Sequence, residues 1–234
     1  MATAQHTGVW TRPDRAAAGP KPRHSRDSIA RAAIDVADKD GLEAVSMRSV
    51  AAALGSGTAS LYRYLKSQDE LIEVMIDAVS AEYDLETPSG TAAAKLTDLA
   101  FQSRSIMHRH RWLPPLLLTR PALGPNSLRY LEYALSALSG AGIGESAKLR
   151  TVAMLTAITA AHALNELSAA GPPAADGSPG EYLATIARSG QYLYLGTALA
   201  NASPVTDPDE TFREVIIGHL AGAGVRDQRC GRHS

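Results

Sequence analysis

Alanine and leucine recur at helical spacings along almost the whole chain, whereas the period-two alternation of a half-buried strand is missing. Only 5% of the residues are aromatic, which also disfavours a sheet, because strands are enriched in aromatic and β-branched residues. The sequence therefore predicts an all-α fold. With 234 residues, of which 45% are hydrophobic, the chain can bury one large core or divide into a small and a medium domain.

Charge, cysteine content and hydropathy narrow the class of protein. The net charge of −1 argues against indiscriminate binding to polyanions, so any contact with nucleic acid needs a local basic patch. The single cysteine, Cys230, has no partner in its own chain, which excludes an intramolecular disulfide and fits a reducing cytosol. No stretch approaches the ~18 apolar residues that span a bilayer, and residues 1–19 lack a secretory signal. We expect a soluble, cytoplasmic protein with no membrane partner.

The first third of the chain has the pattern of three short helices. Helices are expected over about 25–41, 46–54 and 58–66, and Gly55-Ser56-Gly57 forms a tight turn between the last two. A longer helix is expected over about 67–86, because Ser67 and Glu70 have the spacing of a capping box before an apolar stripe. The pattern up to this point is a helix-turn-helix flanked by two further helices.

The rest of the chain predicts a second, larger helical region with its own core. Its helices are expected over about 92–110, 125–139, 145–170, 180–200 and 208–222. Pro114-Pro115 and the segment Pro121–Pro125 are expected to interrupt the helical pattern, and residues 171–180 to form a flexible loop.

The string SMRSVAAALGSGTASLYRYLKSQDEL, residues 46–71, resembles the DNA-binding domain of the tetracycline-repressor (TetR) family. The helix before it and the long helix after it lie where that family has them. The resemblance implies an N-terminal three-helix DNA-binding domain, residues 25–66, and a larger ligand-binding and dimerisation domain, residues 67–225. Residues 1–24 are expected to form a flexible basic arm, either solvated or in contact with DNA, and residues 226–234 a disordered tail.

The resemblance and the chemistry together select candidate DNA-binding residues. Arg48 matches a family position that reaches into the major groove, where a guanidinium can pair with guanine O6 and N7. Tyr62 matches the family's phosphate-binding tyrosine, whereas Tyr64 and Gln68 depart from the usual histidine and lysine. The complete set is Ser46, Arg48, Thr58, Ala59, Ser60, Tyr62, Tyr64 and Lys66.

The segment from His110 to Leu117, with Arg120 to Asn126 after it, resembles the subgroup related to the tetracycline repressor itself. In that subgroup this region lines an effector pocket, and the last two large helical segments build a dimer interface. The candidate ligand-binding residues, for each of which core packing is the alternative, are Phe101, Met107, Trp112, Leu116, Tyr130, Tyr133, Met154 and Ile158. The candidate interface residues are Leu155, Ile158, Leu164, Leu167, Phe212, Val215, Ile216 and Leu220.

We expect neither a metal nor another cofactor. His162 and Glu166 share a helix face and His108 and His110 end another helix, but such spacings also arise by chance. The sequence carries no nucleophile elbow, phosphate-binding loop or zinc-protease motif, so we expect no enzyme.

The sequence therefore predicts a homodimeric transcriptional repressor that binds palindromic double-stranded operator DNA and is released by a small-molecule effector. A ligand-responsive activator is the alternative within the same class. A helical protein-interaction scaffold and an enzyme are the alternatives from other classes.

Overall fold

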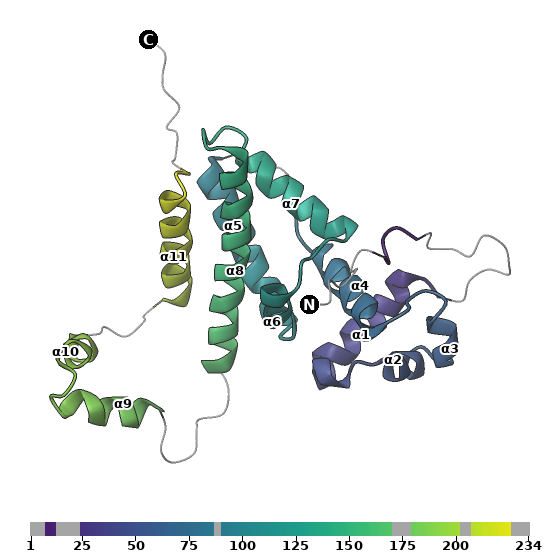
Figure 1. Cartoon of the computed structure of the whole chain (residues 1–234), viewed down its shortest axis with the longest axis horizontal. Coiled ribbons are helices and arrows are strands. Elements are labelled where there is room, and N and C mark those ends of the chain that lie inside the picture. The colour runs from purple at the N-terminus through teal and green to yellow at the C-terminus, as the bar shows by residue number, and fades with distance from the viewer. Residues whose placement is uncertain (1–7, 13–23, 87–89, 170–178, 202–206, 226–234) are drawn as a thin grey trace, which may run out of the picture.

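The computed structural model describes residues 8–12, 24–86, 90–169, 179–201 and 207–225. Within these ranges the chain forms helices and no strand, so the predicted all-α fold is confirmed (Figure 1). The elements are α1 (Arg26–Asp40), the 3-10 turn η1 (Leu42–Ala44), α2 (Met47–Ala53), α3 (Thr58–Leu61), α4 (Gln68–Ser80), α5 (Ala92–Arg109), α6 (Leu113–Thr119), α7 (Pro125–Ala137), α8 (Glu145–Ala169), α9 (Pro179–Arg188), α10 (Leu193–Asn201) and α11 (Pro208–Gly222).

Serine side chains begin the helices of the N-terminal domain. The Ser25 and Ser46 hydroxyls each accept the backbone N–H three residues later, at the first turns of α1 and α2. Ser67 caps α4 in the same way, but the predicted reciprocal bond of a capping box is absent there. The Glu70 carboxylate instead accepts the backbone N–H of Lys66, at 2.7 Å, and so ties the start of α4 to the segment that follows α3.

Two apolar cores hold the described helices together. The first joins α1–α4 to one face of α5, α6 and α8, and it includes Ile29, Leu61 and Met75, none of which is exposed. The second lies among α5, α7, α8 and α11 (Figure 1). Because the first core runs from the helix-turn-helix into the larger domain, the two regions pack as neighbours without an intervening linker.

Four helix boundaries differ from the sequence-based expectation. Helix α3 ends at Leu61 rather than near residue 66. Pro114 and Pro115 do not interrupt the chain but lie in the first turn of α6, where a missing N–H breaks no helical hydrogen bond. Helix α4 ends at Ser80 rather than near residue 86. The single helix expected over 180–200 is two helices, α9 and α10, separated by a turn in which Gly190 has a φ of 72°.

Part of the predicted flexible arm is packed. Val9 is fully buried against the first core, and Arg12 forms an ion pair with Glu70. The Arg26 guanidinium also donates to the Arg12 carbonyl, at 3.0 Å. The expectation of an unpacked arm is therefore wrong for residues 8–12, because one valine and one ion pair fix this segment on α1 and α4. Residues 1–7 and 13–23, and the predicted tail 226–234, lie outside the described residues.

Half of the predicted dimer-interface residues belong to the interior of the chain. Leu155, Phe212, Ile216 and Leu220 are buried in the second core, so they are not available to a partner. Exposed apolar side chains of the same two helices include Met154, Val215 and Ile217. The prediction is therefore wrong for the four buried residues, whereas Val215 is exposed as expected and Ile158, Leu164 and Leu167 are partly exposed.

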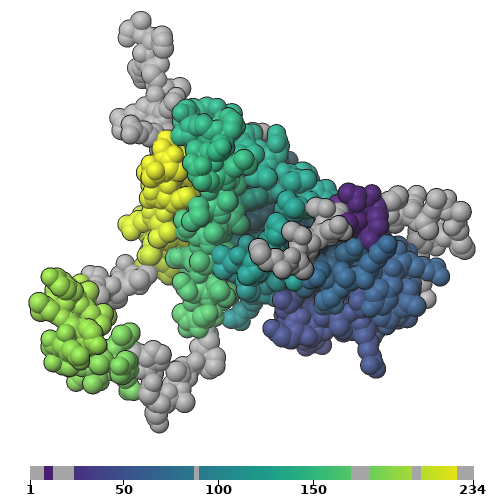
Figure 2. All heavy atoms as spheres, viewed as in Figure 1, coloured from purple at the N-terminus to yellow at the C-terminus, as the bar shows by residue number. Residues whose placement is uncertain are grey.

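Helices α9 and α10 pack on each other and lie apart from the rest of the bundle (Figure 2). Their large apolar side chains are exposed, and Tyr194 is the extreme case with 89% of its surface accessible. Leu193 and Tyr182 are also strongly exposed. Exposed apolar surfaces of this kind are typical of sites that bind another protein, a ligand or a membrane.

Asp77 joins α4 to the first turn of α7. This buried carboxylate accepts the backbone N–H groups of Asn126 and Ser127, at 2.8 and 3.0 Å, and the Asn126 side-chain amide at 3.0 Å. It therefore caps α7 from another helix. Gly124 packs so closely on this site that a Cβ atom there would overlap the Asp77 carboxylate.

We predict that Gly124→Ala lowers the free energy of unfolding by about 1–3 kcal/mol, because the added methyl group must displace Asp77 from the hydrogen bonds that cap α7. Urea unfolding at a fixed protein concentration measures the effect. Gly140→Ala is the matched control, since a Cβ atom at Gly140 meets no neighbour within 4 Å. Equal stabilities for the two variants would contradict the close contact at Gly124.

Candidate nucleic-acid interface and ligand cavity

The segment from α2 to the start of α4 forms a helix, a tight turn and a second helix. Gly55 makes the turn with a φ of 59°, a conformation that favours glycine, and Gly57 begins α3 in extended backbone. Leu61 and Leu65 are fully buried beneath α3 and fix its rotation on the domain. The opposite surface of α3 and of the turn after it faces away from the core.

The predicted DNA-binding residues fall into two groups by exposure. Arg48, Ala59, Tyr62 and Lys66 are exposed, and about half of the Tyr62 surface is accessible. The other four are partly buried, and these are Ser46, Thr58, Ser60 and Tyr64. Ser46 is occupied as the cap of α2 and Tyr64 packs against the first core, so neither side chain is fully free.

Two further residues of this surface were not among the predicted set. Arg63 is exposed beside Tyr62 and adds a second cation near Lys66; its place in the helix-turn-helix was the signal available from sequence. Gln68, noted as a departure from a usual lysine, donates its side-chain amide to the Val45 carbonyl at 2.7 Å. Gln68 therefore fastens α4 to the loop before α2, a role that the sequence pattern did not indicate.

Glu70 holds the N-terminal segment, α4 and the end of the recognition region together. Burial opposes its ionisation, but the Arg12 guanidinium and the Lys66 backbone N–H, both bonded to the carboxylate, lower the pKa of Glu70 below its ordinary value. The carboxylate therefore stays charged at neutral pH. This charge fixes the position of Lys66 relative to α4.

A cavity of about 450 Å³ lies between α4, α5, α6, α7 and α8. Its walls are mainly apolar, and hydroxyl groups and one guanidinium supply its polar atoms. The lining residues are Ile76, Val79, Ser80, Tyr83, Ile106, Leu113, Leu117, Arg120, Pro121, Ala122, Leu123, Ser127, Tyr130, Leu131, Leu149, Val152, Ala153 and Thr156. A cavity of this volume and lining suits a small, largely apolar molecule.

Two tyrosines form an aromatic pair in the cavity wall. The rings of Tyr83 and Tyr130 are tilted, with centroids 4.8 Å apart. The Tyr83 hydroxyl donates to Ser103 at 3.0 Å, and the Tyr130 hydroxyl lies 3.2 Å from that of Thr156. Burial raises the pKa of both tyrosines above the ordinary value of 10, so both hydroxyls are neutral at physiological pH.

Tyr130 is the one predicted ligand-binding residue that lines this cavity, and the other seven lie elsewhere. Met107 and Leu116 are buried in the first core, and Tyr133 and Ile158 pack in or against the second. Phe101 packs on the ring of Phe212, and Met154 is half exposed on α8. Sequence reasoning missed the cavity face of α4, because Ile76 and Val79 have the same spacing as an ordinary core stripe.

Trp112 joins the two domains instead of lining the cavity. Its indole N–H donates to the Asp38 carboxylate of α1 at 2.7 Å, and its ring is buried in the first core. The same carboxylate lies 2.9 Å from His110 Nδ1, while His110 Nε2 lies 2.9 Å from Glu82. The end of α1 is thus bonded to the connection between α5 and α6, and Leu113, directly after Trp112, reaches the cavity.

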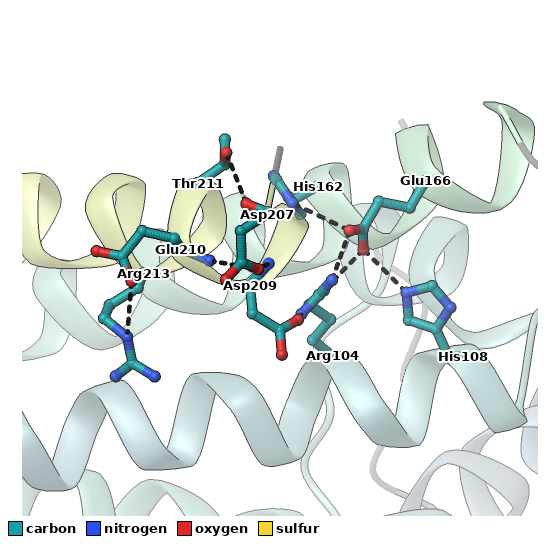
Figure 3. A network of polar contacts seen from close by, with 9 residues as sticks. All are labelled: Arg104, His108, His162, Glu166, Asp207, Asp209, Glu210, Thr211 and Arg213. Atoms are coloured by element: carbon teal, nitrogen blue, oxygen red, sulfur yellow. Dashed lines mark hydrogen bonds and ion pairs between the residues drawn. The ribbon is translucent and has the colours of Figure 1, made fainter. Parts of the chain in front are cut away.

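Two of the histidines considered as possible metal ligands, His108 and His162, belong to an ion network around Arg104 (Figure 3). Arg104 donates to both oxygens of Glu166, at 2.7 and 2.8 Å, and to Asp209 at 2.6 Å. His108 and His162 contact the same Glu166 carboxylate, at 2.9 and 3.4 Å (Figure 3). A guanidinium therefore occupies the position at Glu166 that a cation would take, and the network fastens α5, α8 and the start of α11.

The pKa of Glu166 lies well below its ordinary value of 4.5. Burial opposes its ionisation, but the bidentate bond from Arg104 and the contact with His108 prevail and lower its pKa to about 2.

In the described part of the chain no group of three metal-binding side chains is present. Among the described helices none is long and apolar enough to cross a membrane.

Two family models match the chain over most of its length. The model described as "Bacterial regulatory proteins, tetR family" matches residues 29–75, and the model described as "Tetracyclin repressor-like, C-terminal domain" matches residues 86–223. The first match contains the helix-turn-helix. The second contains most of the residues that line the cavity.

Curated relatives include an HTH-type transcriptional repressor, DrrR1, of Streptomyces coeruleorubidus, which is 34% identical over 161 residues. That match covers 68% of this chain and 60% of the relative. An HTH-type transcriptional regulator of Saccharopolyspora erythraea is 33% identical over 139 residues, 59% of this chain and 58% of the relative. The chain thus spans about 60% of the length of these relatives.

Among solved structures, apo ActR of Streptomyces coelicolor superposes with a TM-score of 0.70 at 28% identity, covering 88% of this chain and 99% of ActR. ActR in complex with actinorhodin has the same TM-score and identity, and covers 86% of this chain and 97% of that one. The likeness extends over both the helix-turn-helix and the helices that surround the cavity.

We predict that Glu166→Gln lowers the free energy of unfolding at pH 7 by about 1–3 kcal/mol, because it weakens the charge-assisted bonds to Arg104. Because folding lowers the pKa of Glu166, its ionised carboxylate stabilises the folded state at pH values above its ordinary pKa of 4.5. This stabilisation is lost as the pH falls toward 2. The difference between Glu166→Gln and the unaltered protein should therefore shrink over that range. Urea unfolding at stepped pH measures it, with the exposed Glu214→Gln as control. A difference that does not change with pH would contradict the assignment.

Proposed function

The chain belongs to the TetR family of bacterial regulatory proteins, and from this membership we propose that it is a transcriptional repressor released from operator DNA by a small molecule. One observation carries the proposal: α4 begins beside the exposed helix-turn-helix, and its last two turns form a wall of the cavity. The relatives support it, since DrrR1 is named as a repressor and ActR has been solved in complex with actinorhodin.

The proposed DNA interface is the exposed surface of α2 and α3. Arg48 projects from the first turn of α2 and is assigned to a base edge, because a guanidinium can pair with two acceptors of guanine. Tyr62 and Lys66, with Arg63 between them, are assigned to phosphates, which position a protein without reading sequence. Thr58, Ala59 and Ser60 are small enough to let the start of α3 approach the bases.

The proposed active form is a homodimer on a palindromic operator in the cytoplasm. One recognition helix buries too little surface for tight binding, whereas two helices related by a two-fold axis reach successive major grooves. The exposed apolar side chains on α8 and α11, such as Met154 and Ile217, lie on the helices that the resemblance assigns to dimerisation. The exposed face of α9 and α10 adds apolar area for the same contact.

The proposed switch is a change in the position of α4. Asp77 couples α4 to α7, and Ser80 bonds to Ser127 at 3.0 Å in the cavity wall. A ligand that fits the cavity better in one arrangement of these helices stabilises that arrangement. Because the other end of α4 positions the recognition region, ligand and DNA must weaken each other's binding by the same factor.

We predict that the protein protects a two-fold symmetric site in the DNA upstream of its own gene, with half-sites about 34–36 Å apart. Gel shift and footprinting measure the protection, and sedimentation of the complex measures the number of chains bound. Protection of an asymmetric site by a single chain would contradict the proposed dimer.

We predict that Tyr62→Ala and Arg48→Ala weaken DNA binding in different ways. Loss of a phosphate contact at Tyr62 should weaken binding to all sequences by a similar factor. Loss of a base contact at Arg48 should cost about 1–3 kcal/mol at one base pair and relax the preference there. Binding to a set of single-base operator variants separates the two results.

Arg129→Ala is the control for this pair, because Arg129 is an exposed cation on α7 and lies outside the proposed interface. Uniform weakening by Arg48→Ala across all operator variants would reassign Arg48 to a phosphate.

A further inference from the structure

Arg120 is the one charged residue that the described part of the chain contributes to the cavity lining. It follows α6 in extended backbone, next to Pro121, Ala122 and Leu123, which form the adjoining wall. Its side chain is 29% exposed, so the guanidinium lies at the rim of the cavity rather than in free solvent. With no acidic side chain in the described lining, the cavity favours a neutral or negatively charged molecule over a cation.

The hydroxyl hydrogens of the cavity wall are already engaged within the protein. Ser80 donates to the Ile76 carbonyl and Thr156 to the Val152 carbonyl, at 2.9 and 3.1 Å. Because each hydroxyl has a single hydrogen, Ser127 must then donate to Ser80, and Tyr130 to Thr156. Tyr83 donates to Ser103.

These hydroxyl oxygens still have lone pairs, so they can accept hydrogen bonds from a ligand. The side-chain polar groups of the described wall are therefore mainly hydrogen-bond acceptors, and a side-chain donor is available to a ligand chiefly at Arg120. This distribution matches an apolar molecule with hydroxyl groups along its body and an anionic group at one end.

Arg120 is also bonded to the DNA-binding side of the molecule. Its Nη1 lies 2.8 Å from Oδ1 of Asp69, in the first turn of α4. Asp69 is half exposed, and ion pairs of this kind contribute only ~0–1 kcal/mol. The pair is thus weak enough for a second anion to compete for the guanidinium.

We propose that the effector is an apolar, hydroxylated carboxylate, and that its carboxylate takes Arg120 from Asp69 and thereby loosens the start of α4. This inference rests on the proposed ligand-released repressor and names the class of ligand and the contact through which it acts. Arg120 binds the anionic group of the ligand. Asp69 is a positioning residue, because loss of its bond to Arg120 frees the first turn of α4, which lies beside the recognition region. Gln68 directly precedes Asp69 and Lys66 lies three residues before it, so both residues lie close to the contact that the ligand replaces.

Three matched probes test the selection of charge: 6-hydroxy-2-naphthoate, its neutral carboxamide, and the cationic 6-(aminomethyl)-2-naphthol. Fluorescence titration of the full chain should give the carboxylate about tenfold tighter binding than the amide, and the ammonium the weakest. Arg120→Gln should remove the difference between carboxylate and amide, and Arg120→Lys should restore part of it. Arg129→Gln, the exposed control on α7, should leave it unchanged.

Asp69→Asn tests the coupling. Without its competitor Arg120 is free, so the carboxylate should bind up to about fivefold tighter while the affinity of the amide stays the same. In the unaltered protein, saturating carboxylate should weaken binding to the upstream DNA more than saturating amide does. In Asp69→Asn the two probes should weaken it equally.

The outcomes separate this inference from the proposed function. Equal binding of carboxylate and amide to the unaltered protein, or a difference that survives Arg120→Gln, would overturn the assigned ligand class while leaving a ligand-binding cavity. An unchanged carboxylate affinity in Asp69→Asn would overturn the competition. Binding of none of the three probes would overturn both the inference and the assignment of the cavity as the effector site.

Discussion

The burial of α4 between α1 and α7 is the interaction on which the other elements depend. Leu71, Met75 and Val79 are almost completely removed from solvent, and each side chain of this size contributes roughly 1.5–3 kcal/mol when buried. The helix is apolar on most of its circumference, so it packs against the DNA-binding domain on one side and the larger domain on another. A shift of α4 therefore changes the packing of the DNA-binding domain and of the larger domain at the same time, so α4 couples the two domains.

Polar contacts along α4 differ in strength, and the difference determines what can move. Asp77 is buried, and its bonds to the first turn of α7 are costly to leave unmade. Asp69 and Arg120 are partly solvated, so their ion pair exchanges partners at little cost. The cavity end of α4 is thus held by buried bonds, whereas the end beside the helix-turn-helix includes one partly solvated ion pair, Arg120–Asp69, for which a second anion can compete. A ligand resets the equilibrium only by the difference between its affinities for the two arrangements.

The ion network around Arg104 has a different consequence. It fastens the start of α11 to α8 and α5 through a guanidinium that is mostly shielded from solvent and bonded to two carboxylates. Arg104 also lies over the ring of Phe212, 5.1 Å from its centroid, so the polar network and the second core support each other. The helices assigned to dimerisation are in this way rigid within one chain, and the Asp38–Trp112 bond makes a similar junction between α1 and α6.

The sequence by itself determined the helical class, the position of the helix-turn-helix and the cap residues Ser46 and Ser67, because these depend on local periodicity and on hydrogen bonds within one turn. It could not identify the cavity. Ile76 and Val79 have the spacing of core residues, and only the placement of α7 and α8 opposite them leaves a space there. Trp112, expected in that cavity, instead bonds Asp38, which is 74 residues away in the chain. The apolar stripe of α11 was evident from sequence, but which edge is buried was decided by α5 and α8, because burial depends on neighbours that a single helix does not specify.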